Sequence, residues 1–218
     1  MSTADTFILR RERMIQKMYQ MGIHSEIVLQ AMFDVPRHLF VEDALAYSAY
    51  DNAALPIGLG QTISQPYIVA KMTELLIGLD NKTPQRILEI GTGCAYQTAI
   101  LSCLPTRAIY SIERLPALHE QAKKNLQKIK QHKKAYLSCG DGYQGLPEKA
   151  PFDGIIVTAA PKEIPSALLL QLAIGGRLVL PLGTEKEQFL WVIEKKEHGF
   201  LETCIEKVCF VPLVNSKV

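Results

Sequence analysis

Short apolar runs alternate with helical patterns from residue 86 onward, and this alternation constrains the fold more than any other feature of the chain. The runs are rich in β-branched and other apolar residues. They are RILEI (86–90), AIYSI (108–112), AYLSC (135–139), DGIIVT (153–158) and GRLVLP (176–181). Near-continuous apolar strands separated by helices are typical of a parallel sheet covered on both faces. The sequence therefore predicts an α/β fold with a doubly wound, mostly parallel sheet.

The two ends of the chain depart from this alternation. QFLWVIEKK (188–196) and CIEKVCFVPL (204–213) follow one another without a spacer long enough for a helix. They predict an antiparallel strand pair that finishes the sheet. The patterns at 8–21, 25–33 and 65–77 predict helices that pack over one end of the sheet.

Length and composition are those of an ordinary globular protein. Hydrophobic residues make up 48% and charged residues 21% of the 218 residues. We expect a single domain over 1–218, because a chain of this length builds one sizeable core. Within it, 1–80 would hold the N-terminal helices and an active-site loop. The remainder, 81–218, would hold a cofactor-binding sheet and the C-terminal strands.

Several functional classes are disfavoured. The net charge of +2 is too small to indicate nucleic acid or an anionic membrane surface, and the lysines of 122–134 fall on the solvated face of a helical pattern. The N-terminus lacks the apolar core of a signal peptide, and no stretch is long enough to cross a bilayer. The cysteines form no Cys-x-x-Cys pair, which favours free thiols and argues against a metal site. We therefore expect a cytoplasmic protein without a metal.

The stretch LEIGTGCAYQTA (88–99) carries the first functional signal. Gly91 and Gly93 directly follow a predicted strand, where glycines allow a tight turn and the close approach of a ligand. No Gly-Lys-Ser/Thr follows, so the turn is not a phosphate loop. A dinucleotide fingerprint needs a further glycine where this chain has Tyr96, so a nicotinamide oxidoreductase is disfavoured.

Two acids follow the next two strands. Glu113 ends the second strand, where a carboxylate can accept both hydroxyls of a ribose; the alternative is an exposed acid paired with Arg114. Asp141 and Gly142 follow the third strand. There Asp141 could accept from an adenine amino group, or simply form an Asp-Gly turn. Together these loops fit an adenosine ligand without a phosphate chain, which points to S-adenosylmethionine.

The loop DNAALPIGLGQTISQPYIVAKM (51–72) has glycines on either side of a flexible segment, followed by Ser64. Ser64 is predicted to cap the next helix, with Pro66 in the first turn. A serine hydroxyl beside free helix N–H groups is also suited to hold a carboxylate. A serine hydrolase is disfavoured, because Ser64 lies in no Gly-x-Ser-x-Gly motif.

Four segments resemble protein-L-isoaspartate O-methyltransferases, and the resemblance covers nearly the whole chain. The segments are this loop, LEIGTGCAYQTAILS, GDGYQGLPEKAPFDGIIVTAAPKEIP and LVLPLG. The resemblance implies a Rossmann-like class I methyltransferase fold, with S-adenosyl-L-methionine as cofactor and S-adenosyl-L-homocysteine as product. It implies that Ser64 is the active-site serine. It also implies that the cofactor is bound by Gln61, Thr62, Ile63, Gly91, Gly93, Glu113, Asp141 and Gly142.

The family commonly has Gly-Ser-Gly-Tyr where this chain has Gly93-Cys94-Ala95-Tyr96. Ala95 restricts positive φ, so this departure bears on cofactor affinity. Cys94 is interpreted as a small buried residue in preference to a reactive thiol.

The resemblance further implies methyl transfer to the free α-carboxylate of L-isoaspartyl residues in damaged proteins and peptides, by a protein expected to be a monomer. Such a carboxyl titrates near pKa ~3.5, so it is ionised at pH 7 and needs no general base. Two alternatives stay open: a methyltransferase with another acceptor, and a non-catalytic binding module on the same fold.

Overall fold

The computed structural model describes residues 3–78, 83–129 and 132–215. Its centre is a seven-stranded sheet with the order β5-β4-β3-β6-β7-β8-β9. The strands are β3 (Arg86–Ile90), β4 (Ala108–Glu113), β5 (Ala135–Cys139), β6 (Phe152–Val157), β7 (Leu172–Thr184), β8 (Glu187–Lys196) and β9 (Gly199–Val208). The chain passes outward from β3 to β4 and β5, and then returns to β6 on the other side of β3. Ligands of open α/β sheets bind at such a reversal of strand order.

The predicted strand directions are confirmed. β3 to β7 are parallel, whereas β8 pairs antiparallel with β7 and β9 pairs antiparallel with β8. The central strands are apolar on both sides because both faces are covered: Ile87 contributes to the core on one face and Leu88 to the core on the other.

Helices cover the two faces unequally. The first face carries α3 (Pro66–Ile77), α4 (Tyr96–Cys103) and α5 (Pro116–Gln127), and the second carries the short α6 (Ser166–Gln171). In α5 the apolar positions Leu118, Ala122 and Leu126 are buried and Lys123 and Lys124 are exposed, which confirms the predicted amphipathic helix. Residues 130–131 of the predicted lysine-rich segment lie outside the described residues.

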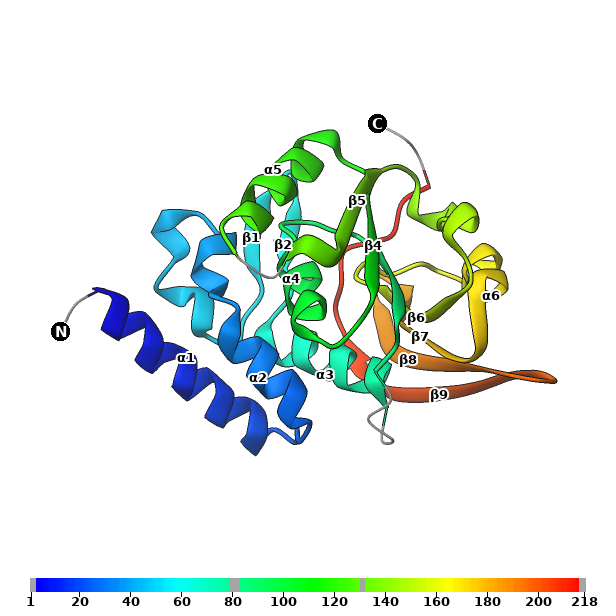
Figure 1. The fold of residues 1–218 in the computed structure, drawn as a ribbon, viewed down its shortest axis with the longest axis horizontal. Coiled ribbons are helices and arrows are strands. Elements are labelled where there is room, and N and C mark those ends of the chain that lie inside the picture. Colours follow the sequence, from blue (N-terminus) through cyan, green and yellow to red (C-terminus); the bar gives the residue numbers. More distant parts are fainter. Residues whose placement is uncertain (1–2, 79–82, 130–131, 216–218) are drawn as a thin grey trace.

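The predicted N-terminal helices are present, but their predicted location at one end of the sheet was wrong. α1 (Thr3–Gln20) and α2 (Glu26–Asp34) pack on each other and on α3, and α2 also contacts α4 (Figure 1). Their buried side chains, such as Met18 and Met32, join the core on the α3–α4 face because both helices have an apolar stripe to cover. The expected boundary at residue 80 lies outside the described residues.

The segment expected to be flexible is a β-hairpin. β1 (Leu55–Gly58) pairs antiparallel with β2 (Gln61–Ile63). The two residues between them, Leu59 and Gly60, have φ values of 51° and 69°. Positive φ at both positions is typical of a type I′ turn, whose twist matches that of the two strands it joins. Gly60 is therefore part of a tight turn between β1 and β2.

Short 3-10 helices complete the described chain: η1 (Arg37–Phe40), η2 (Asp43–Leu45), η3 (Ser48–Tyr50), η4 (His132–Lys134), η5 (Gly142–Gln144) and η6 (Pro147–Lys149). Within the described ranges, no helix combines the length and apolar character needed to span a membrane. The same residues contain no group of three or more His, Cys, Asp or Glu side chains arranged to hold a metal ion.

Candidate active site

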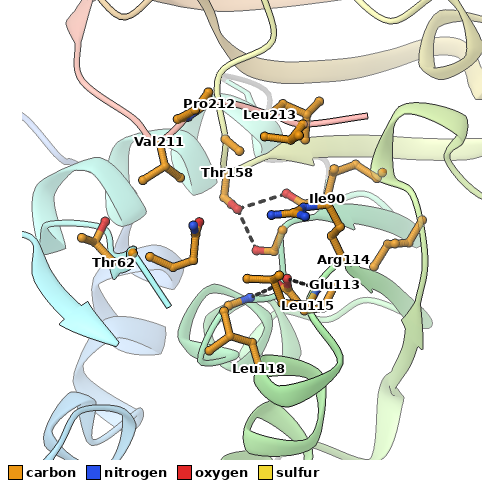
Figure 2. Close-up of a pocket in the computed structure, with 18 of the residues that line it drawn as sticks. Thr62, Ile90, Glu113, Arg114, Leu115, Leu118, Thr158, Val211, Pro212 and Leu213 are labelled. Carbon is orange, nitrogen blue, oxygen red and sulfur yellow. Dashed lines mark hydrogen bonds between the residues drawn. The ribbon is translucent and has the colours of Figure 1, made fainter. Parts of the chain in front are cut away.

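A cavity of about 300 Å³ opens at the carboxyl ends of β3, β4 and β6. Figure 2 shows its lining: Thr62 lies on one side and Glu113 and Leu115 lie on the other, with Thr158 and then Val211–Leu213 above them in this view. Among the predicted cofactor residues, Gln61, Thr62, Gly91, Gly93, Glu113 and Gly142 line this cavity. These residues come from four separate parts of the chain: β2, the turn after β3, the end of β4 and the start of η5.

The turn from β3 into α4 requires left-handed backbone. Gly91 and Gly93 have φ values of 93° and 55°, and Ala95, the N-cap residue of α4, has φ 70° and ψ 21°. Ala95 is fully buried, so its methyl group packs in the core while its backbone adopts a conformation that glycine would adopt more easily. The N–H groups of Gly91 and Thr92 donate to the carbonyl oxygen of Ile112 at 2.9 and 3.2 Å, which ties the turn to β4.

Glu113 is held by two backbone donors. One carboxylate oxygen accepts the N–H of Gly93 at 2.7 Å, and the other accepts the N–H of Leu115 at 2.9 Å. The residue is 5% exposed. Each carboxylate oxygen has two lone pairs, so both keep acceptor capacity beyond these bonds. The side chain is fixed in place with that capacity at the cavity wall.

Asp141 differs from Glu113. Its carboxylate accepts the N–H of Tyr143 at 2.9 Å and so caps η5, which is the Asp-Gly turn that the sequence left open. Asp141 is not among the residues that line the cavity, whereas Gly142 is. A Cβ at Gly142 would lie 2.3 Å from Cγ2 of Ile90, so this glycine permits close packing of the loop against the end of β3.

A second, smaller cavity of about 40 Å³ adjoins the first. Ile63 and Ser64 line it, and Thr62, Gly91, Gly93 and Thr158 line both cavities. The predicted cap by Ser64 was wrong: α3 begins at Pro66, its N-cap residue is Gln65, and no side chain in the described part of the chain caps it. A residue before proline is restricted to extended backbone, and Gln65 takes that conformation at φ −57° and ψ 146°. The Ser64 side chain is therefore not used as a helix cap.

The described residues that line the smaller cavity offer no ionised nucleophile or base. Its titratable lining residues are Cys94 and Tyr96. Burial raises the pKa of the Cys94 thiol to about 11, and burial also raises the pKa of Tyr96. Both side chains are neutral at pH 7, which agrees with Cys94 as a small buried residue and not a reactive thiol.

The sequence reasoning missed Thr158. Its hydroxyl group lies within hydrogen-bond distance of the carbonyl oxygens of Ile90, at 3.0 Å, and Gly91, at 2.7 Å (Figure 2). A Cβ at Gly91 would lie 2.4 Å from that hydroxyl oxygen, so the glycine makes room for the threonine. Its position as the last residue of the fourth predicted strand, 153–158, was the signal that could have found it.

The C-terminal segment was also missed as part of the site. Val211–Val214 line the larger cavity. Ala160 holds this segment, because its N–H donates to Val211 O and its carbonyl oxygen accepts the N–H of Leu213, both at 2.8 Å. Nothing in the sequence pattern indicates that residues after the last strand return to the carboxyl ends of β3 and β6.

These residues fit an adenosine-bearing cofactor without phosphates. The anchored carboxylate of Glu113 suits a pair of hydroxyl groups, and Ile112, Leu118 and Leu213 supply apolar walls for a flat ring. The β3–α4 turn has no lysine, and its first backbone N–H groups donate to Ile112. The turn therefore lacks the donors that cradle a phosphate chain.

Comparison with known proteins gives a consistent result. The family model for protein-L-isoaspartate(D-aspartate) O-methyltransferase matches residues 9–218. A protein-L-isoaspartate O-methyltransferase of Chromobacterium violaceum is 56% identical over 95% of this chain and 91% of its own length. One of Halorhodospira halophila is 50% identical over 95% and 93%, respectively.

Solved structures agree with this result. A protein-L-isoaspartate O-methyltransferase superimposes with a TM-score of 0.84 at 27% identity, over 95% of this chain and 67% of that one. A Plasmodium falciparum structure in complex with S-adenosyl-L-homocysteine superimposes with a TM-score of 0.81 at 24% identity, over 94% and 99%. The predicted fold class is confirmed.

Proposed function

The chain belongs to the protein-L-isoaspartate O-methyltransferase family, and from this premise we propose how its site works. The protein is an S-adenosylmethionine-dependent methyltransferase that esterifies the free α-carboxylate of L-isoaspartyl residues in damaged proteins and peptides. One observation carries this proposal: a cavity with an anchored acid adjoins a smaller one with a serine, and Thr62, Gly91, Gly93 and Thr158 line both. Two ligands bound in these cavities would meet at these shared residues.

The larger cavity is assigned to the cofactor. When bound, S-adenosylmethionine supplies a methyl group on a positively charged sulfur. Glu113 would accept hydrogen bonds from the ribose hydroxyls, and its two backbone donors keep it in position for this role. Asp141 would accept from the adenine amino group, while Gly142 keeps the loop close to the cavity. Gln61, Thr62 and Ile63 would cover the cofactor from the hairpin side.

The smaller cavity is assigned to the acceptor. Ser64 would donate its hydroxyl to the substrate carboxylate and so orient it, without abstracting a proton. An α-carboxyl with a pKa near ~3.5 is already ionised at pH 7, so the neutral Cys94 and Tyr96 side chains leave no chemical requirement unmet. Rate acceleration would then come from alignment of the reacting atoms. Because opposite charges disappear during transfer, walls that exclude water favour the reaction.

The product explains a repair role. Methoxide leaves an ester more readily than oxide leaves a carboxylate, so the neighbouring backbone amide nitrogen attacks the ester carbonyl, closes a succinimide, and releases methanol with the amide proton. Hydrolysis of the succinimide returns part of the chains to normal aspartate. A monomeric state and a cytoplasmic location stay predictions.

The decisive experiment compares an isoaspartyl peptide with its normal aspartyl twin as methyl acceptors. The proposal predicts labelling of the isoaspartyl peptide alone. Equal labelling of the two peptides would indicate another acceptor. Calorimetry with S-adenosylhomocysteine tests the non-catalytic alternative, because a protein that binds the product but labels neither peptide is not a repair enzyme.

A further inference from the structure

Arg37, in η1, is a buried cation that is hydrogen-bonded to the backbone of Ser64. It is 0% exposed. Its Nε donates to the carbonyl oxygen of Ala49 at 2.7 Å, and its Nη2 donates to the carbonyl oxygen of Ser64 at 2.7 Å. Arg37 therefore connects η1 and η3 directly to the backbone of the residue assigned to the substrate carboxylate.

The guanidinium group lies behind the wall of the smaller cavity. It stacks over the ring of Tyr96, with its central carbon 4.7 Å from the ring centroid. Tyr96 and Ser64 both line the smaller cavity. Two of the contacts of Arg37 are therefore with residues of the acceptor pocket.

The charge of Arg37 has no counterion in the described parts of the chain. Its Nη1 is buried and has no hydrogen-bond partner there. The titratable groups that face it are Tyr96, Cys94 and Tyr50, and burial raises the pKa of each, so all three are neutral at pH 7. Burial lowers the pKa of Arg37 itself, but a guanidinium remains protonated in proteins. A buried charge is normally paired, and the described residues supply no anion to pair with Arg37.

We propose that Arg37 is a positioning residue for the acceptor: it fixes Ser64 through the backbone, and its uncompensated charge selects an anionic group in the smaller cavity. The inference rests on the proposed function, because the anion is the α-carboxylate of the substrate. An acceptor carboxylate would complete an ion pair across the cavity wall. A neutral group of the same shape would not, so Arg37 would contribute to the choice of acceptor.

The test measures binding and not only turnover. Calorimetry on protein saturated with S-adenosylhomocysteine compares two peptides that differ at one group, an isoaspartyl α-carboxylate and its α-carboxamide. We expect the wild type to bind the carboxylate peptide at least tenfold more tightly. In Arg37→Met this preference falls below threefold, because the carboxylate peptide alone loses affinity. The Kd of S-adenosylhomocysteine, measured without peptide, changes less than twofold.

Two further variants separate charge from structure. Arg37→Lys keeps the cation with fewer donors, so it retains the carboxylate preference while kcat falls through the loosened Ser64. Arg11→Met is the matched control: the Arg11 guanidinium donates to Phe33 O at 2.7 Å and lies over the Phe33 ring, and its hydrogen bonds within the described chain reach neither cavity. It keeps the wild-type preference even if its thermal midpoint falls.

The outcomes are distinct. An equal rise in the Kd of both peptides in Arg37→Met overturns the proposal, since a purely structural role of Arg37 affects the binding of both peptides alike. If Arg37→Met does not fold, Arg37→Lys decides, and loss of its carboxylate preference overturns the role of the charge. A wild-type protein that binds neither peptide overturns the proposed function itself, and with it the role assigned to Arg37.

Discussion

Glu113, the last residue of β4, accepts the backbone N–H of Gly93 in the turn after β3 at 2.7 Å. This bond joins two residues that the sequence separately indicates as parts of a cofactor site. The other carboxylate oxygen of Glu113 accepts the N–H of Leu115. The Glu113 side chain is therefore hydrogen-bonded to both the β3–α4 turn and the start of α5.

Glu113→Gln should weaken cofactor binding. The glutamine amide oxygen can accept the N–H of Gly93 or of Leu115 but not both in the present geometry. The amide nitrogen, itself a donor, would then face the remaining N–H. Hydrogen bonds to charged groups contribute about 1.5–3 kcal/mol, so the Kd of S-adenosylhomocysteine should rise at least tenfold by calorimetry. Glu120→Gln, an exposed change on α5, should leave that Kd unchanged. Similar affinities for the two variants would remove Glu113 from the cofactor site.

Ser64→Ala should slow methyl transfer without changing its pH dependence. Loss of a hydrogen bond to a carboxylate costs about 1.5–3 kcal/mol, so kcat/KM for an isoaspartyl peptide should fall roughly 10- to 100-fold. The shape of the pH–rate profile should persist, because Ser64 moves no proton. Ser166→Ala, at an exposed position in α6, is the control. A new pH-dependent limb in Ser64→Ala alone would show that the hydroxyl takes part in proton transfer.

Ala95→Gly should be nearly neutral for stability, and cofactor binding should be unchanged or tighter. The left-handed backbone of Ala95 costs an alanine roughly 1–2 kcal/mol. Against this, glycine loses a buried methyl group, about 0.8 kcal/mol, and more backbone entropy, about 0.5–1 kcal/mol. Ala99 is equally buried but lies inside α4, so Ala99→Gly relieves no strain. It should lower the unfolding free energy, measured with urea, by at least about 1 kcal/mol more than Ala95→Gly does. A clear loss of affinity in Ala95→Gly would mean that the methyl group shapes the turn.

Glu89 should make stability depend on pH. Its Oε2 accepts from Thr98 at 2.5 Å and from Ser111 at 2.6 Å, whereas its buried Oε1 has no partner among the described residues. Burial raises its pKa to about 7 from an ordinary value of 4.5. Between these values the folded protein holds a proton that the unfolded chain has released, so stability falls as pH rises.

The corresponding variant is Glu89→Gln, which cannot ionise. The decrease in unfolding free energy from pH 5 to pH 7 should be smaller by about 2 kcal/mol than in the wild type. Urea unfolding at the two pH values measures it, and Glu12→Gln, an exposed change in α1, is the control. An unchanged difference in Glu89→Gln would indicate that Glu89 is ionised in the folded protein throughout this range.

Local patterns predict the strands well, both for β3, which is buried on both faces, and for β5, an edge strand that is only partly buried. β3 and β5 begin and end at the predicted residues, and the buried residues of α5 recur at the predicted helical spacing. β7 is longer than predicted: it begins at Leu172, ahead of Gly175 and Gly176, and a register shift lies between Phe152 and Gly154 on its partner β6. Glycines in a strand mark such irregularities, but they do not show whether the strand extends beyond them toward the N-terminus.

By itself, the sequence determined which residues end the parallel strands, and therefore that Gly91, Glu113 and Gly142 share one edge of the sheet, because the carboxyl ends of parallel strands meet there. Only the tertiary structure decided that Ser64 and Val211 reach this edge, that Asp141 caps its own turn, and that Arg37 lies buried behind Ser64. Periodicity records which face of an element is buried. It carries no record of which distant segment covers that face, since those contacts depend on how whole layers pack.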